Sequence, residues 1–173
     1  MLIGVASSGV HSNGYSLVRK VVERSGLSLI ADAPFASGMA LGEALLTPTR
    51  LYVKSALAAI ATGGVKGLAH ITGSGITGNL PRVLPPGFDA ELDLTAWKLP
   101  PVFAWLAQQA ELPGNEMLST FNCGVGLIVV AEKAKAADVV AAFSASGERA
   151  FPVGALVPAA GAESAVRYRG SFA

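Results

Sequence analysis

Short apolar runs alternate along the chain with segments whose apolar residues recur at helical spacing. The runs Leu2–Ala6 (LIGVA) and residues 126–132 (GLIVVAE) are typical of buried strands. In Tyr15–Ser25 and Pro101–Ala110 the apolar residues lie three or four positions apart, which is typical of amphipathic helices. Gly26 follows the first of these segments and a proline opens the second, as expected at helix ends.

The remaining segments are assigned in the same way. Strands are predicted for residues 65–71, 88–94, 151–157 and 165–170, helices for residues 51–62 and 134–146, a helical turn for residues 78–86, and loops for residues 32–42 and 159–164. The 51–62 helix should present an apolar stripe of Leu51, Leu57, Ala58 and Ile60. Helices and strands alternate, but the last two strands follow each other directly. We therefore predict an α+β fold, a mixed-sheet α/β sandwich with helices packed on a mixed β-sheet.

Composition places further bounds on the protein. A length of 173 residues predicts a single domain, residues 1–173, with its own core. Because 51% of the residues are hydrophobic and only 14% are charged, we expect another domain or subunit to cover part of the surface. The apolar runs are much shorter than the roughly 18 residues of a membrane helix, so no membrane partner is predicted. A net charge of +1 without a Lys/Arg cluster argues against nucleic-acid binding.

The single cysteine, Cys123, excludes an internal disulfide and suits a reducing compartment, so a cytoplasmic location is predicted. Its expected role is that of a small apolar core residue. One cysteine and two histidines are too few for a Cys/His metal site. Asp89, Glu91 and Asp93 alternate along one strand, which suggests solvent exposure, and no carboxylate cluster is suited to Mg²⁺. The chain begins directly with a strand, without a signal peptide, as expected at a domain boundary.

The first segment of candidate chemistry lies between the first strand and the first helix, in LIGVASSGVHSNGYSLVRK. Ser7, Ser8, His11, Ser12 and Asn13 form a polar loop that leads into a helix N-terminus, where an anion such as phosphate is favoured. The simpler alternative is that serine and asparagine only cap the helix. No lysine follows the glycines at the spacing of a Walker A loop.

The second segment, AHITGSGITGNLPR, carries the other histidine, His70. Thr72, Gly73, Ser74 and Gly75 combine hydroxyl groups with glycines that let a ligand approach the backbone closely. The alternative is an ordinary strand-to-helix connection. Because each loop holds one of the two histidines, we predict that the loops share a ligand site, with both histidines as candidate catalytic residues.

Two further candidates for substrate contact are weaker. Lys54 lies within a predominantly apolar helix and has the length to reach a phosphate, although a solvated helix lysine is more common. Asn122, in TFNCGVG, precedes a buried strand, where it has the alternative role of forming a turn.

Five segments together resemble the C-terminal domain of the phosphoribosylformylglycinamidine cyclo-ligase family, also called aminoimidazole ribonucleotide synthetase. In chain order they are LIGVASSGVHSNGYSLVRKVVE, LLTPTRLYVKSAL, AHITGSGITGNLPRVLP, WKLPPVFAWL and NEMLSTFNCGVGLIVV, so the resemblance covers nearly the whole chain. It implies an ATP-dependent ligase of purine biosynthesis that converts formylglycinamidine ribonucleotide into aminoimidazole ribonucleotide, ADP and phosphate.

The resemblance also implies a division of labour. This chain corresponds to the second half of a two-domain synthetase and would line the pocket for the phosphorylated ribonucleotide. The family's N-terminal domain, absent from this chain, supplies the acidic residues for ATP and Mg²⁺ and most of a homodimer interface. The isolated chain is therefore expected to be inactive.

The second loop departs from the family pattern, which reads Gly-Gly-Gly, an aromatic or aliphatic residue, any residue, then Glu-Asn. Ser74 replaces the middle glycine, and Gly78 stands where the acid is expected. Serine is tolerated there only if its φ is negative or if the backbone strain is tolerated. Loss of the acid removes a possible polar contact to substrate or to the partner domain.

Two alternatives stay open at this stage. The first is another member of the same superfamily: the formylglycinamide ribonucleotide amidotransferase, selenophosphate synthetase, thiamine-monophosphate kinase or the hydrogenase maturation factor. The second is a non-catalytic binding or assembly module that retains the fold.

Overall fold

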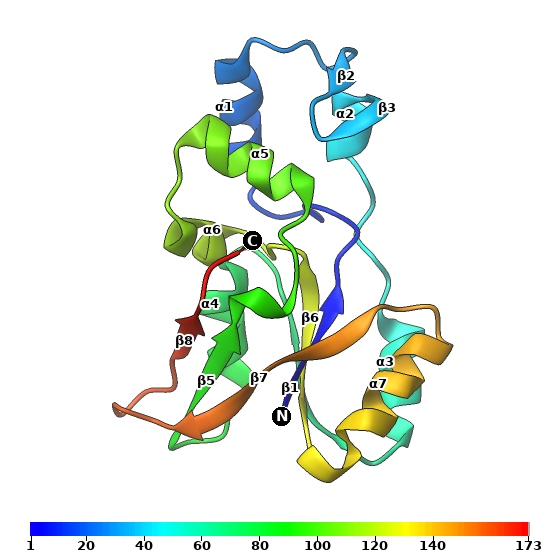
Figure 1. The fold of residues 1–173 in the computed structure, drawn as a ribbon, viewed down its shortest axis with the longest axis vertical. Helices are drawn as coiled ribbons and strands as arrows, with labels where there is room; N and C mark the ends of the chain where they lie inside the picture. Colours follow the sequence, from blue (N-terminus) through cyan, green and yellow to red (C-terminus); the bar gives the residue numbers. More distant parts are fainter. Residues whose placement is uncertain (173) are drawn as a thin grey trace.

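A six-stranded mixed sheet forms the centre of the molecule, and helices pack on both of its faces (Figure 1). The computed structural model describes residues 1–172. The strands are β1 (Leu2–Ala6), β4 (Val65–His70), β5 (Phe88–Asp93), β6 (Val125–Ala131), β7 (Ala150–Pro158) and β8 (Val166–Arg169), in the order β4-β6-β1-β7-β5-β8. Neighbouring strands are antiparallel except β5 and β8, which are parallel. The predicted mixed-sheet fold is thus confirmed.

The helices fall into three groups in Figure 1. Helices α3 (Val53–Ala61) and α7 (Ala136–Ala145) pack on one face of the sheet, and α4 (Gly75–Asn79) and α6 (Gly114–Thr120) lie on the other. Helices α1 (Tyr15–Ser25) and α5 (Pro101–Ala110) extend beyond one end of the strands, beside α2 (Leu41–Leu45) and the small hairpin of β2 (Asp32–Ala33) and β3 (Ala36–Ala40). Short 3₁₀ helices cover Leu80–Val83, Leu94–Ala96 and Lys133–Lys135.

Two hydrophobic cores lie on opposite faces of the sheet, and the central strands contribute to both. Leu2 of β1 and Ile128 of β6 belong to the larger core, whereas the next residue of each strand, Ile3 and Val129, belongs to the smaller one. Because both faces of β1 and β6 are covered, nearly every residue in these strands is buried and apolar. This explains why both strands are recognisable in the sequence as continuous apolar runs.

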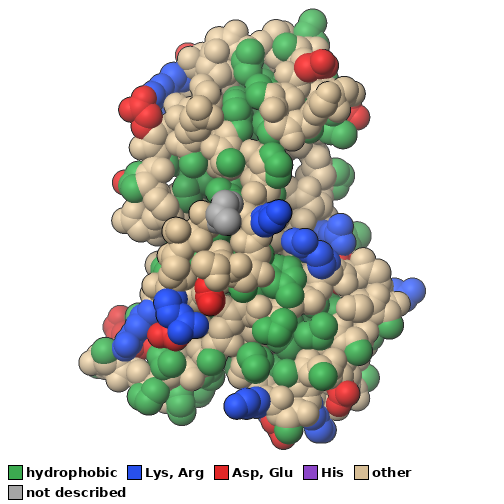
Figure 2. Space-filling view, viewed as in Figure 1, with side chains coloured by type: hydrophobic (Ala, Val, Ile, Leu, Met, Phe, Trp, Pro, Cys, Tyr) green, Lys and Arg blue, Asp and Glu red, His purple; other side chains and the backbone are tan. Residues whose placement is uncertain are grey.

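The predicted stripe of the 51–62 helix is wrong. Helix α3 begins at Val53, and it buries Ser55 and Ala59, whereas Leu51 and Leu57 are 85% and 62% exposed. Small residues allow α3 to lie close to α7, and the large apolar side chains point outward as a result. Apolar side chains appear in several separate patches in Figure 2, and no described helix is long and apolar enough to cross a membrane.

Other local predictions also need correction. Residues 32–42, predicted as a loop, form the β2–β3 hairpin and the start of α2, and helix α6 was not predicted. Asp89, predicted to be solvent-exposed, is 2% exposed and accepts hydrogen bonds from the backbone N–H groups of Ala165 and Ala160 and from Arg167. Chiefly because of the Ala165 bond, the pKa of this carboxyl lies below its usual value. Cys123 is fully buried, as expected, and burial raises its pKa to about 12.

Gly75 packs directly against the backbone of Leu118 in α6, so we expect that no larger residue fits at this position. Its φ is +60°, and an added Cβ would lie 2.1 Å from the carbonyl oxygen of Leu118. We expect Gly75→Ala to lower the free energy of unfolding by about 3 kcal/mol, through overpacking and left-handed strain. Gly114→Ala is the control, because no atom lies within 4 Å of its added Cβ. Urea unfolding would measure both; equal stabilities would contradict the expected contact.

Candidate functional site

The two histidine-bearing loops leave the sheet at the same edge. Strands β1 and β4 are both antiparallel to β6, which lies between them, so they run parallel to each other and end together. The ladder extends past both strand ends, because Ser7 N–H donates to Gly124 O and Ile71 N–H to Gly126 O, each at 2.9 Å. The sheet topology therefore brings the first loop (residues 7–14) and the second loop (residues 71–74) together.

His11 belongs to the first loop, and its ring is buried against the backbone of the same loop. Its side chain is 1% exposed, and its Nε2 accepts a hydrogen bond of 3.1 Å from the backbone N–H of Ser8. The residue adopts a left-handed conformation, with φ of 58°, which turns the chain back over the ring. Gly126 provides the space: an added Cβ there would lie 2.5 Å from His11 Cε1 and 2.2 Å from the hydroxyl oxygen of Tyr52.

Burial makes the His11 ring neutral. Desolvation, with smaller contributions from the charges of His70 and Arg50, lowers the pKa of His11 to about 4. Since Nε2 accepts a bond, the proton of the neutral ring resides on Nδ1, which is buried and has no partner among the described residues. Such a group supports the loop well but is a poor proton donor near neutral pH.

Three rings gather at the shared edge. The centroids of His11 and His70 are 6.4 Å apart, and the Tyr52 centroid lies 6.2 Å from His11 and 6.0 Å from His70. Tyr52 donates its hydroxyl hydrogen to Ala6 O at 2.8 Å, and burial raises its pKa. Of the three, only His70 is exposed. The predicted proximity of the two histidines is thus observed, and His70 is the one that solvent reaches.

The segment from Thr47 to Arg50 crosses the first loop and binds its hydroxyl groups. Ser8 Oγ donates to Pro48 O at 2.7 Å, and Ser12 Oγ lies 3.2 Å from Thr49 Oγ1. Arg50, beside the ring cluster, pairs with Glu148 at 2.7 Å. These contacts fix the first loop from above, and Ser12 remains exposed at its rim.

Asn122 fixes the first loop from below. Its side chain is 1% exposed; Nδ2 donates to Gly9 O at 2.9 Å, and Oδ1 accepts from Gly124 N–H at the same distance. Asn122 therefore joins the first loop to the start of β6 and presents no polar atom to solvent. Lys54 lies in the exposed first turn of α3, and no hydrogen bond or ion pair joins it to either loop within residues 1–172.

A residue that sequence analysis did not select, Asn79, organises the second loop. Its side chain is 5% exposed, and Nδ2 donates to Gly75 O at 2.8 Å and to Thr72 O at 3.2 Å. Thr72 Oγ1 in turn donates to Asn79 Oδ1 at 3.1 Å. The φ of Ser74 is −127°, so serine is accommodated without left-handed strain. The position of Asn79 directly after the glycine-rich loop was the available sequence signal.

The loops also meet directly, and a groove lies beside the first one. An added Cβ at Gly73 would lie 4.0 Å from Asn13 Oδ1. The groove, of about 290 Å³, is lined by Ser7 and Ser8 of this loop and by residues that include Phe35 and Pro100. Ser7 Oγ is buried without a hydrogen-bond partner among the described residues. The second loop does not line this groove, so the two loops meet at one edge without enclosing a common cavity.

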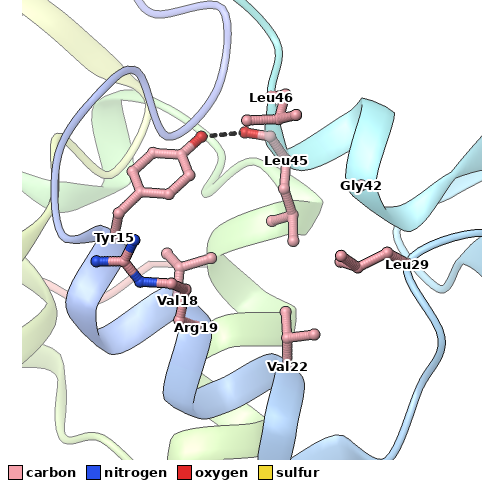
Figure 3. A pocket seen from close by; sticks show the side chains of 8 residues that line it. All are labelled: Tyr15, Val18, Arg19, Val22, Leu29, Gly42, Leu45 and Leu46. Atoms are coloured by element: carbon pink, nitrogen blue, oxygen red, sulfur yellow. Dashed lines mark hydrogen bonds between the residues drawn. The ribbon is translucent and has the colours of Figure 1, made fainter.

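A separate apolar cavity of about 290 Å³ lies between α1 and α2 (Figure 3). The Tyr15 hydroxyl donates to the carbonyl oxygen of Leu45 across its upper end, as drawn in Figure 3. This bond attaches α2 to α1 and so positions the Thr47–Arg50 segment that follows α2. Residues 1–172 contain no group of three or more His, Cys, Asp or Glu side chains suited to a metal ion.

The buried histidine should make folding sensitive to acid. The unfolded chain protonates His11 near pH 6.5 and the folded chain only near pH 4, so the free energy of unfolding should fall as the pH drops through this interval. The gap corresponds to about 3 kcal/mol. Urea titrations from pH 4 to pH 7.5 would measure this, with His11→Asn losing that part of the fall and His70→Gln keeping most of it. An unchanged pH dependence in His11→Asn would contradict the assignment.

Known structures share this fold at low sequence identity. The protein TT0281 of Thermus thermophilus matches with a TM-score of 0.57 and 22% identity, covering 100% of this chain and 50% of that one. The hydrogenase maturation protein HypE of E. coli matches at 0.52 and 23%, covering 97% and 46%. Thiamine-monophosphate kinase of Stenotrophomonas maltophilia K279a matches at 0.51 and 11%, covering 99% and 50%. The chain thus spans about half the length of these structures, and the likeness concerns the fold.

Family membership rests on a match of another kind. The sequence model of the family described as AIR synthase related protein, C-terminal domain, matches residues 1–167, which is nearly the whole chain. On this match, the chain belongs to the AIR synthase related protein family and represents its C-terminal domain.

Proposed function

We propose that this chain is the C-terminal half of an ATP-dependent cyclo-ligase of de novo purine biosynthesis, and that its two loops line the pocket for formylglycinamidine ribonucleotide. In the proposed reaction, ATP transfers a phosphoryl group to the formyl amide oxygen of the substrate, which releases ADP. An internal nitrogen then attacks the activated carbon, and phosphate leaves as the imidazole ring closes. The protein's task in such chemistry is to position the reactants and to balance charge.

The observation that carries this proposal is the convergence of the two loops at one sheet edge. The ring centroids of His11 and His70 lie 6.4 Å apart, and Gly73 faces Asn13 across the gap. Two polar loops at one sheet edge give a ribonucleotide contacts on two sides. The five sequence segments of the cyclo-ligase type, in order along the chain, add support for this substrate class.

Exposure divides the candidate residues into two roles. Polar groups at the edge that solvent reaches are suited to contact substrate: Ser12, Asn13, His70, Thr72, Gly73 and Ser74. His11 and Asn122 are 1% exposed and act as positioning residues beneath the first loop. His70 is therefore the histidine we assign to direct contact with the reacting group, and His11 holds the loop that faces it.

The described residues do not provide a site for Mg²⁺, because no cluster of carboxylates gathers near the loops. In the proposal, a domain outside this chain binds the metal ion and most of the ATP, and it also supplies the contacts of a homodimer. Turnover therefore requires that domain, and the proposed location of the complete enzyme is the cytoplasm.

The isolated chain should neither hydrolyse ATP nor close the ring. Purified chain, supplied with ATP, Mg²⁺ and formylglycinamidine ribonucleotide, should release no phosphate above a blank without protein. Adding the missing domain, as the full-length protein, should restore phosphate release. Turnover by the 173-residue chain alone would place the active site wholly within it and refute the division proposed above.

His70 provides the sharper test within the full-length enzyme. We expect His70→Gln to lower kcat/KM on the order of 10²-fold, because a positioned acid–base group typically contributes this much or more. Lys20→Gln, an exposed change on α1 away from both loops, should retain wild-type kinetics. Wild-type kinetics in His70→Gln would remove His70 from the site.

One observation keeps two other functions open. The chain could belong to another ATP-using enzyme of the superfamily, or it could be a non-catalytic module. The second loop carries Ser74 and Gly78 where the cyclo-ligase pattern has glycine and an acid. A substrate panel on the full-length protein would separate the enzymes from one another. Calorimetry with a ribonucleotide phosphate would identify the non-catalytic module, which should show no binding at millimolar concentration.

A further inference from the structure

Side chains at positions 74 and 78 would clash with each other. An added Cβ at position 78 would lie 2.5 Å from Ser74 Cβ and 2.6 Å from Ser74 Oγ. The first of these atoms is fixed to the backbone, so rotation of the serine side chain does not relieve the clash. The backbone of Gly78 is helical and has no positive φ, so its conformation does not require glycine. Glycine is needed at position 78 because serine occupies position 74.

Arg82 is the second residue that contacts Ser74. Ser74 directly precedes α4, and Arg82 lies in the 3₁₀ turn Leu80–Val83 that follows it. Arg82 Nη2 donates a hydrogen bond of 3.2 Å to Ser74 Oγ. The arginine is exposed, and it forms no ion pair within residues 1–172. Its charge therefore reaches the second loop without being neutralised.

The serine hydroxyl is oriented by its neighbours. Ser74 Oγ accepts a hydrogen bond from Arg82 Nη2. Asn79 Nδ2 lies 3.4 Å from the same oxygen, but its two hydrogens already bond to Gly75 O and Thr72 O. Because Arg82 is the donor in its bond to the serine, the hydroxyl hydrogen remains available to an external acceptor, and the guanidinium keeps further N–H groups beside it.

We propose that Ser74 and Arg82 form a contact point for a phosphate group of the ligand, and that Gly78 makes this contact possible. The hydroxyl and the guanidinium would each donate to phosphate oxygens, a combination in which charge-assisted hydrogen bonds are strong. That this phosphate belongs to the substrate rests on the proposed function. The phosphate contact itself rests only on the positions of Ser74, Gly78 and Arg82.

The steric part is tested by a double-mutant cycle that needs no ligand. We expect Gly78→Ala to lower the urea midpoint of the wild-type protein, and to leave it equal or higher in a Ser74→Gly background, because the clash is then absent and alanine favours a helix over glycine. The same loss of stability in both backgrounds would overturn the coupling.

The binding part is tested with ribose 5-phosphate and with inorganic phosphate, by calorimetry without ATP. We expect Arg82→Gln to weaken binding of both probes at least fivefold and Ser74→Ala to weaken it less. Arg19→Gln on α1, which removes the same charge elsewhere, is the matched control and should bind as wild type does. Arg82→Lys should recover part of the loss, because lysine keeps the charge but not the fork.

The outcomes separate this proposal from the proposed function. Binding that is equal in wild type and Arg82→Gln, or absent from the wild-type protein, would overturn the phosphate contact, whether or not the full-length enzyme turns over. Weakened binding in Arg82→Gln together with no cyclo-ligase activity in the full-length protein would support the contact and refute the proposed reaction.

Discussion

Strand β6 hydrogen-bonds to β1 along one side and to β4 along the other, and the candidate site depends on this double pairing. Because antiparallel pairing on both sides makes β1 and β4 parallel, the two polar loops end up at one edge although about 60 residues separate them in sequence. The strand is buried along its whole length and contributes alternate residues to the two cores, so a shift in its register would disrupt the packing on both faces. The sheet and its cores thus fix where the two loops lie.

Buried polar side chains then hold each loop in shape. Within the first loop, His11 accepts a hydrogen bond from Ser8, and Asn122 joins that loop to the start of β6. In the second loop, the Asn79 side chain donates to the backbone oxygen of Gly75. Each of these residues is at most 5% exposed, so losing a partner would leave a polar group unsatisfied away from water. Loops supported in this way present their exposed groups at defined positions, which reduces the cost of ordering them around a ligand.

The sequence was informative where local rules agree with tertiary packing. The ranges of α1 and α5 and the central strands β1 and β6 follow from periodicity and end signals. Periodicity failed for α3, because its small residues face α7 and its leucines face outward. At the site, the pairing of the two histidines was predictable. The neutral state of His11 was not, because it depends on Tyr52 and Gly126, which lie more than forty positions away in sequence.

The departure of the second loop from the cyclo-ligase pattern gains a physical meaning from the space around Ser74. Serine at 74 and a side chain at 78 exclude each other, so the two departures amount to one change. An acid at position 78 would add a negative charge four residues before Arg82. With glycine there, Arg82 instead bonds to Ser74 and keeps its charge unpaired among the described residues. The change therefore does more than remove a contact, because it makes this point of the loop positive and favours ligands that bring negative charge to it.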